Sequence, residues 1–283
     1  MRVNKAITGV TGVLALLVGV GVAGWAAPAA AEPAGLETSI ESTAKNSVDK
    51  AITAPCPVGK VVTGGGGYLN TSSAEGRVGL DRLEPLANGT GFVATMREVG
   101  AVDYAEDWQL SALAMCATPP AGYQVVAVTG AVGTEYVTAS CGTKSVIGMG
   151  GRINSGLGEV VLDQVVPSFD LRSVTTRGVR VQGSALAGWS VTAFAVCANT
   201  PAGLERISIQ SDNESAQQHQ GIVACPAGKS LYGAGADINA GNGQVLLTGV
   251  NITTENTVRA WANEDGDGYG GNWSFNAYGI CGS

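Results

Sequence analysis

Histidine is almost absent from this chain of 283 residues, since His219 is the only one. Multi-histidine metal sites are therefore excluded, and a Ser-His-Asp or Cys-His nucleophile would have to use this single residue. His219 lies in the polar stretch 213–220, which is typical of a loop. We predict a solvated loop histidine, no metal site, no cofactor and no catalytic set.

Charged residues are scarce, and positive ones most of all. Lys and Arg number 16 against 23 Asp and Glu, and the four types together make up only 14% of the chain. Nucleic acids and anionic membrane surfaces are bound through basic patches, so neither is an expected partner. Apolar residues make up 45%, which is enough to bury a core and excludes a disordered chain.

Only one long apolar run is present, from Ala6 to Trp25. Arg2 and Lys5 precede it, and small residues at positions 29 and 31 follow it, as a signal peptidase site requires. We interpret residues 1–31 as a secretory signal peptide and expect a secreted, extracellular protein. The alternative is an uncleaved membrane anchor, because the run approaches spanning length. Without Arg2 and Lys5 the mature chain has 14 basic and 23 acidic residues, a net charge of about −9.

Three tandem copies of one module follow this leader. Pro-Ala-Gly opens each copy, at residues 33, 120 and 201, with spacings of 87 and 81 residues. Each copy then has a cysteine, a glycine-rich segment, an alternating strand, and a Trp followed eight residues later by a second cysteine. We place module 1 at 32–121, module 2 at 122–202 and module 3 at 203–283.

The closing strand of each module has one wholly apolar face. Every second residue from Trp108 to Cys116 is apolar, and the other copies repeat the pattern from Trp189 and Trp273. This period of two predicts β-strands, with the three Trp residues in the core of the repeat. The fold class is therefore predicted to be all-β.

The six cysteines of an exported chain predict three disulfides, and no C-x-x-C pair suggests a metal. Two pairings respect the repeat. One lies within each module: Cys56–Cys116, Cys141–Cys197 and Cys225–Cys281. The other joins successive modules: Cys116–Cys141, Cys197–Cys225 and Cys281–Cys56. We favour the first, because it joins two strands of the same module.

The sequence of each module resembles two groups of known proteins. The Cys-Pro-x-Gly-Lys pattern at Cys56–Lys60 and Cys225–Lys229, the glycine-rich strand and the Trp-Ala-Cys strand face resemble repeats in secreted bacterial proteins of unassigned function. Three Cys-containing β modules are also similar to the vitelline membrane outer layer protein I family, and Leu247–Ile252 resembles its Leu-Asn-Gly-Ile strand. That family folds as a β-prism, three sheets around a pseudo-threefold axis, and is associated with a carbohydrate-rich extracellular coat. The resemblance implies a prism here and carries over no functional residue.

Two arrangements of the modules are open. They can close into one pseudo-threefold β-prism, so that 32–283 forms a single domain, or they can form three small β-sandwiches in a row. The short Pro-Ala-Gly links leave little linker, which favours the closed body.

Carboxylates and unpaired aromatic residues are the remaining candidates for chemistry. Asp81 and Asp163 occupy equivalent strand ends, but the third copy has Thr248 there, so we interpret these carboxylates as structural. Glu264–Gly268 lacks the later ligands of an EF-hand loop and is interpreted as a flexible hairpin turn. The candidate ligand contacts are aromatic residues that break the repeat, since exposed rings stack on sugars: Tyr104, Trp261 and Tyr269.

Three functional hypotheses follow from these observations. The favoured one is a non-enzymatic extracellular binding or surface-coat protein, with a glycan or the cell wall as its partner. The second is a carbohydrate-active enzyme that uses a pair of carboxylates. The third is a secreted protein-interaction or inhibitor protein that uses the variable segments 208–222 and 262–272.

Overall fold

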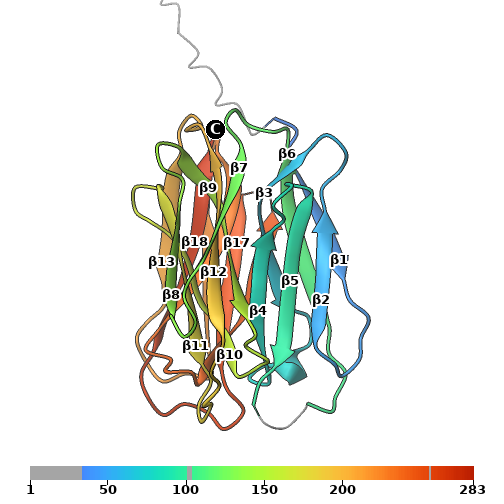
Figure 1. The fold of residues 1–283 in the computed structure, drawn as a ribbon, viewed down its shortest axis with the longest axis vertical. Helices are drawn as coiled ribbons and strands as arrows, with labels where there is room; N and C mark the ends of the chain where they lie inside the picture. Colours follow the sequence, from blue (N-terminus) through green and yellow to red (C-terminus); the bar gives the residue numbers. More distant parts are fainter. Residues whose placement is uncertain (1–33, 101–103, 255) are drawn as a thin grey trace, which may run out of the picture.

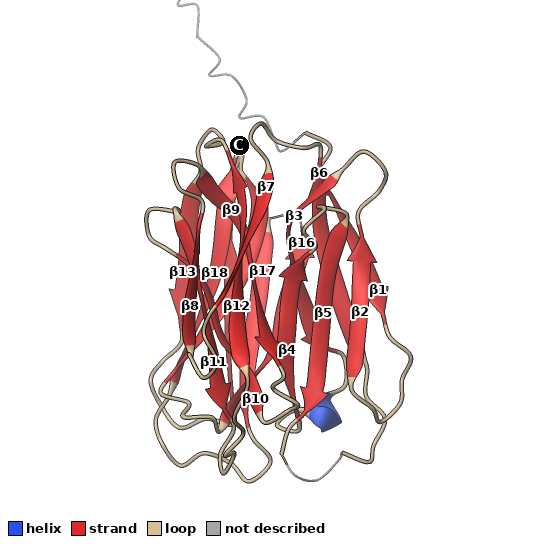
Figure 2. Ribbon diagram, viewed as in Figure 1, coloured by secondary structure: helices blue, strands red, loops and turns tan. Residues whose placement is uncertain are grey.

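The computed structural model describes residues 34–100, 104–254 and 256–283 (Figure 2). The predicted signal peptide, residues 1–31, lies outside the described residues. The described part of the chain forms eighteen β-strands and one short 3-10 helix, Ser72–Ala74, and all its strand pairs are antiparallel. The predicted all-β class is therefore confirmed. Within these residues there is no helix of the length and hydropathy that a membrane span requires.

Each module contributes six strands. Module 1 has β1 (Glu37–Ser42), β2 (Lys50–Pro55), β3 (Val61–Leu69), β4 (Val78–Pro85), β5 (Gly91–Glu98) and β6 (Leu110–Ala117). Module 2 has β7 (Gln124–Thr129), β8 (Tyr136–Ser140), β9 (Ser145–Asn154), β10 (Val160–Pro167), β11 (Ser173–Arg180) and β12 (Ser190–Ala198). Module 3 has β13 (Glu205–Gln210), β14 (Gln218–Ala224), β15 (Ser230–Asn239), β16 (Val245–Thr254), β17 (Thr257–Glu264) and β18 (Ser274–Gly282).

The strands form three six-stranded sheets, each of which combines halves of two modules (Figure 1). Sheet 1/3 has the order β1-β6-β3-β16-β17-β14, sheet 1/2 has β2-β5-β4-β9-β12-β7, and sheet 2/3 has β13-β18-β15-β10-β11-β8. Module 1 shares one sheet with module 2 and another with module 3, and modules 2 and 3 share the third. The pairing is cyclic, which is consistent with the predicted prism. The alternative of three separate sandwiches in a row is wrong, because no sheet belongs to one module.

The halves of each sheet meet along a short seam of only two residue pairs. The pairs are Tyr68–Gly249 and Gly67–Val250 between β3 and β16, Arg82–Arg152 and Leu83–Gly151 between β4 and β9, and Gln164–Asp237 and Val165–Ala236 between β10 and β15. Away from the seams, β3, β9 and β15 contact one another, and so do β4, β10 and β16. These six strands therefore surround a common centre, here called the central axis.

Within each module the two half-sheets pack face to face. Trp108, Trp189 and Trp273 are fully buried between them. One disulfide crosses each sandwich, and the structure has the favoured within-module pairing: Cys56–Cys116, Cys141–Cys197 and Cys225–Cys281. The pairing links the start of the glycine-rich segment to the closing strand of the same module.

Glycines allow the three modules to meet at the central axis. Gly64, Gly148 and Gly233 occupy equivalent positions on β3, β9 and β15. A Cβ at Gly64 would lie 2.6 Å from the Gly233 Cα, and one at Gly233 would lie 2.8 Å from the Gly148 Cα. Real Cβ atoms do not approach backbone atoms so closely. Glycine is therefore required at these positions, because the three strands approach one another closely around the axis.

Candidate binding surface

The outward face of each sheet carries an outer row, defined as six residues that the strand register places side by side, one from each strand. The outer row of sheet 1/3 is Ser42, Ser111, Tyr68, Gly249, Trp261 and Gln220. That of sheet 1/2 is Thr129, Thr192, Arg152, Arg82, Thr95 and Ala51. That of sheet 2/3 is Gln210, Asn276, Asp237, Gln164, Arg177 and Tyr136. The rows occupy equivalent positions but differ in side-chain chemistry, so each offers a different surface.

An aromatic stack lies at the centre of the outer row of sheet 1/3. The Trp261 ring lies over Gly249, where a Cβ would be 2.5 Å from its Cη2 atom, so only glycine leaves room for it. The Tyr68 and Trp261 ring centroids are 6.0 Å apart, and the guanidinium carbon of Arg259 is 5.2 Å from the Trp261 ring. Because Trp261 is only 7% exposed, it forms a base beneath Arg259 rather than an open stacking surface.

The groups around this stack are polar and planar. Arg259 donates to the Gln220 side-chain oxygen from Nε at 3.1 Å and from Nη2 at 3.0 Å, which fixes the guanidinium. On the other side of Tyr68, the Asn70 amide donates to the Ser111 hydroxyl at 2.6 Å. Hydroxyl, amide and guanidinium groups around a half-buried ring can hydrogen-bond and stack with a sugar.

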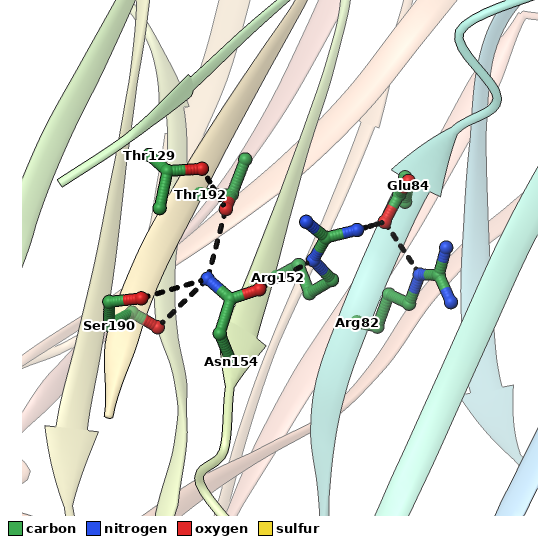
Figure 3. Close-up of polar contacts among 7 residues, drawn as sticks. All are labelled: Arg82, Glu84, Thr129, Arg152, Asn154, Ser190 and Thr192. Atoms are coloured by element: carbon green, nitrogen blue, oxygen red, sulfur yellow. Dashed lines mark hydrogen bonds and ion pairs between the residues drawn. The ribbon is translucent and has the colours of Figure 1, made fainter. Parts of the chain in front are cut away.

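Four of the six residues in the outer row of sheet 1/2 belong to one network of hydrogen bonds and ion pairs: Thr129, Thr192, Arg152 and Arg82 (Figure 3). Glu84 Oε2 accepts from Arg82 Nε at 2.6 Å and from Arg152 Nη1 at 2.9 Å. Arg152 Nε donates to Asn154 at 2.8 Å, and the Asn154 amide continues the network to the β12 residues Ser190 and Thr192. Since Arg82 and Arg152 lie on opposite sides of the seam between β4 and β9, this network holds module 1 to module 2.

The outer row of sheet 2/3 is charged, and a buried carboxylate lies next to it. Asp163 lies beside this row and is 2% exposed; its Oδ2 pairs with Arg177 Nη1 at 3.0 Å. Arg177 also pairs with Glu135 at 3.2 Å. Burial raises the pKa of Asp163 to about 7, with Arg177 opposing the rise and the nearby Asp237 adding to it. Burial also raises the pKa of Asp237.

Asp81, Asp163 and Thr248 occupy equivalent β-bulges in β4, β10 and β16. Each bonds to the next strand of its own hairpin: Asp81 pairs with Arg97 at 3.5 Å, and the Thr248 hydroxyl donates to Asn263 at 2.5 Å. Burial raises the pKa of Asp81 to about 6, with Arg97 opposing the rise. A neutral Thr fills the same position in module 3, which fits a structural role for the two carboxylates.

A cavity of about 480 Å³ opens where the loops after β5, β11 and β17 meet. Val99, Arg77, Asp265 and Asp267 are among the residues that line it. Burial and the neighbouring Asp267 raise the pKa of Asp265 to about 7. Both aspartates come from the predicted flexible turn Glu264–Gly268. Across the described residues, no group of three or more His, Cys, Asp or Glu side chains is arranged to hold a metal ion.

Two of the three candidate aromatic residues support loops. The Tyr104 N–H donates to Glu98 Oε2 at 2.9 Å, and the Trp108 indole donates to Glu98 Oε1 at 3.3 Å. Module 3 repeats this arrangement at 3.1 and 3.2 Å through Tyr269, Glu264 and Trp273. Trp261 is the one candidate that lies in an outer row.

The equivalence of Tyr104 and Tyr269 was not predicted, although the sequence carries a signal for it. Each tyrosine stands four residues before the closing Trp of its module. Module 2 lacks this tyrosine and has Arg180 at the end of β11, where the guanidinium carbon is 5.3 Å from the Trp189 ring. In the described part of the chain, the buried Trp189 indole N–H has no acceptor.

His219 is not in a loop but in β14, where it is 7% exposed. Its ring meets Trp273 edge-on with centroids 4.3 Å apart, and its Nε2 is 3.4 Å from the Glu214 carbonyl oxygen. The prediction of a solvated loop histidine is therefore wrong. Polar residues surround His219 along an edge strand, and only the alternation of the strand turns this one inward.

The two variable segments of the third hypothesis lie side by side. The Glu264 N–H donates to the Gln217 carbonyl at 2.9 Å, and the Ser215 hydroxyl donates to the Tyr269 carbonyl at 3.2 Å. Segments 208–222 and 262–272 thus form one surface region at an end of module 3.

The chain matches no protein-family model, and a search of the curated proteins gives no match.

Proposed function

We propose that this protein is a secreted, non-enzymatic binding or surface-coat protein that binds an extracellular glycan at the outer row of sheet 1/3. The stack of Tyr68, Trp261 and Arg259 carries the proposal. In the other two rows the central charged groups are paired with neighbouring side chains. In sheet 1/3, by contrast, Arg259 is exposed, and among the residues that the structure describes its guanidinium hydrogen-bonds only to the neutral amide of Gln220, through two of its nitrogens.

A sugar ring would lie on Tyr68 and on the guanidinium of Arg259. Its C–H groups would pack on these planar surfaces, while its hydroxyls would bond to the surrounding Gln220, Asn70 and Asn251 side chains. Trp261 contributes by holding the guanidinium in place. Because Arg259 is already stacked and hydrogen-bonded, binding would cost little side-chain entropy.

The predicted location of the protein agrees with such a ligand. Three disulfides suit an oxidising compartment, and residues 1–31 are predicted to direct export. The low content of charge and the acidic balance favour a neutral polysaccharide over an anionic polymer. The resemblance noted in the sequence, to a protein family associated with a carbohydrate-rich extracellular coat, is consistent with such a ligand.

Binding to a glycan array and to cell-wall preparations tests the proposal. Arg259→Ala and Tyr68→Ala should each weaken binding by roughly tenfold, since each removes one stacking contact. The matched control is Thr175→Ala, because Thr175 is the counterpart of Arg259 in sheet 2/3 and should leave binding unchanged. The proposal is contradicted if the wild-type protein binds none of these ligands, or if the control loses as much affinity as the Arg259 variant.

A carbohydrate-active enzyme is the second candidate, and one observation favours it. Asp163 has a pKa raised to about 7 and lies near Asp237, whereas glycoside hydrolysis uses one protonated and one ionised carboxyl group. The test is the release of reducing ends from polysaccharides. Release by the wild-type protein but not by Asp163→Asn would support this function, and no release by the wild-type protein would exclude it for the substrates used.

A further inference from the structure

The outer edge of module 2 has lost the charges that the other modules carry there. The segment 121–140, which contains β7 and β8, has a single charged residue, Glu135. The equivalent segments 34–55 and 202–224 contain five and four. Glu135 is itself paired with Arg177, so this edge presents little free charge.

The geometry of β7 leaves this edge open. Among the strands of the described residues, β7 is the last strand of sheet 1/2 and pairs only with β12. It contains three valines and no charged residue or proline, and nearby apolar side chains are exposed: Val128 at 37%, Val132 at 70% and Tyr136 at 52%. Edge strands are normally protected against pairing by charges, prolines or bulges. An uncharged edge of six residues is therefore a surface for strand addition.

We propose that β7 pairs antiparallel with β7 of a second copy of this chain, which would join two copies of sheet 1/2 into one continuous sheet. A copy carries a net charge of −7 before the leader is removed and is more acidic after it. Two copies therefore repel each other, and they can approach most closely where charge is missing. Self-pairing of β1 would instead bury Glu41, and self-pairing of β13 would bury Arg206.

Sheet geometry restricts the register of this pair. Residues that face each other across an antiparallel pair point to the same face of the sheet, and side chains alternate between faces along a strand. In a symmetric β7–β7 pair the twofold axis normal to the sheet must therefore pass between the two copies of one and the same residue. Centring the pair on Ala127 puts a small residue on the axis. Val126 then faces Val128 of the second copy, and the two valine pairs form an apolar contact on one face of the sheet.

Sedimentation velocity of the secreted full chain across micromolar concentrations tests the proposal. The wild-type protein should dimerise reversibly. Val128→Glu places in β7 the residue that module 1 has at the equivalent position, Glu41. It should raise the dimer dissociation constant more than about tenfold, because it forces a carboxylate against apolar side chains. The matched control is Ile209→Glu at the same position of β13, which should dimerise as the wild type does.

Amide hydrogen exchange locates the interface independently. Amides within Gln124–Thr129 should become more protected as concentration rises in the wild type and in the Ile209 variant, but not in Val128→Glu. Intact disulfides and a cooperative thermal transition would show that the variants are folded. A wild-type protein that stays monomeric overturns the proposal. So does a dimer that survives Val128→Glu or dissociates on Ile209→Glu, because either result places the interface elsewhere.

Discussion

Replacement of Gly148 by alanine tests the close approach of the modules at the central axis. Gly148 lies on β9, and a Cβ at this position would collide with the Thr63 carbonyl of β3, coming within 2.9 Å of its carbon. The obstacle is backbone of another module, so no side chain can turn away. Val196 Cγ2, at 3.2 Å, closes the remaining space.

The expected cost is at the upper end of the range for overpacked cores, about 3 kcal/mol. At 2–4 °C per kcal/mol for a body of this size, the melting temperature should fall by roughly 6–12 °C. Because every module shares two sheets, calorimetry should show a single transition in both proteins. Gly270→Ala is the control: a Cβ there meets nothing within 4 Å, so it should change stability by less than about 0.5 kcal/mol. Equal shifts for both variants, or a separate transition for module 2, would refute this account.

Three other perturbations have outcomes that the structure specifies. The native state favours protonated Asp163, so the stabilisation that this residue contributes is full below its usual pKa of 3.8 and is lost as the pH rises through about 7. At pH 8 the free energy of unfolding of Asp163→Asn, measured by denaturant, should therefore exceed that of the wild type by on the order of 2–4 kcal/mol, and near pH 4 the two should be equal. Trp189→Phe removes an indole N–H that has no acceptor, whereas Trp273→Phe loses hydrogen bonds to Glu264 and to the Ala216 carbonyl. In chemical denaturation the Trp189 variant should therefore lose about 1–2 kcal/mol less free energy of unfolding than the Trp273 variant. Equal losses would contradict the difference in hydrogen bonding between the two indoles. Removing the disulfide by Cys141→Ala with Cys197→Ala should lower the free energy of unfolding by about 4 kcal/mol, because it opens a loop with a sequence separation of 56. A loss below about 1 kcal/mol would contradict the expectation that this disulfide stabilises the fold by restricting the unfolded chain.

Most of the candidate binding surface could not be predicted from the sequence. Trp261 could be singled out because it breaks the repeat, but its partners Tyr68 and Gly249 come from β3 and β16, which belong to different modules. Nothing local to Trp261 indicates that a glycine from β16 makes room for its ring. Tyr104 and Tyr269 support loops instead, and the signal that separates them from Trp261 is their equal spacing from Trp108 and Trp273.

The sequence by itself determined the all-β class, the buried face of the closing strand and the two disulfide pairings that the repeat allows. Alternation from Trp108 to Cys116 fixes which face of that strand is buried, and the threefold repeat limits the disulfide pairings to two. Both signals are local or periodic, so they can be recognised in the sequence without knowledge of the fold.

Only the tertiary structure decided which modules share a sheet. Backbone hydrogen bonds are the same for any pair of strands, and each seam consists of two residue pairs, so the sequence carries little information about the partner. The same holds for His219, whose ring packs against Trp273, the residue just before β18 of sheet 2/3. A period of two predicts that a side chain points inward, but the structure that covers it is set by strands distant in the sequence.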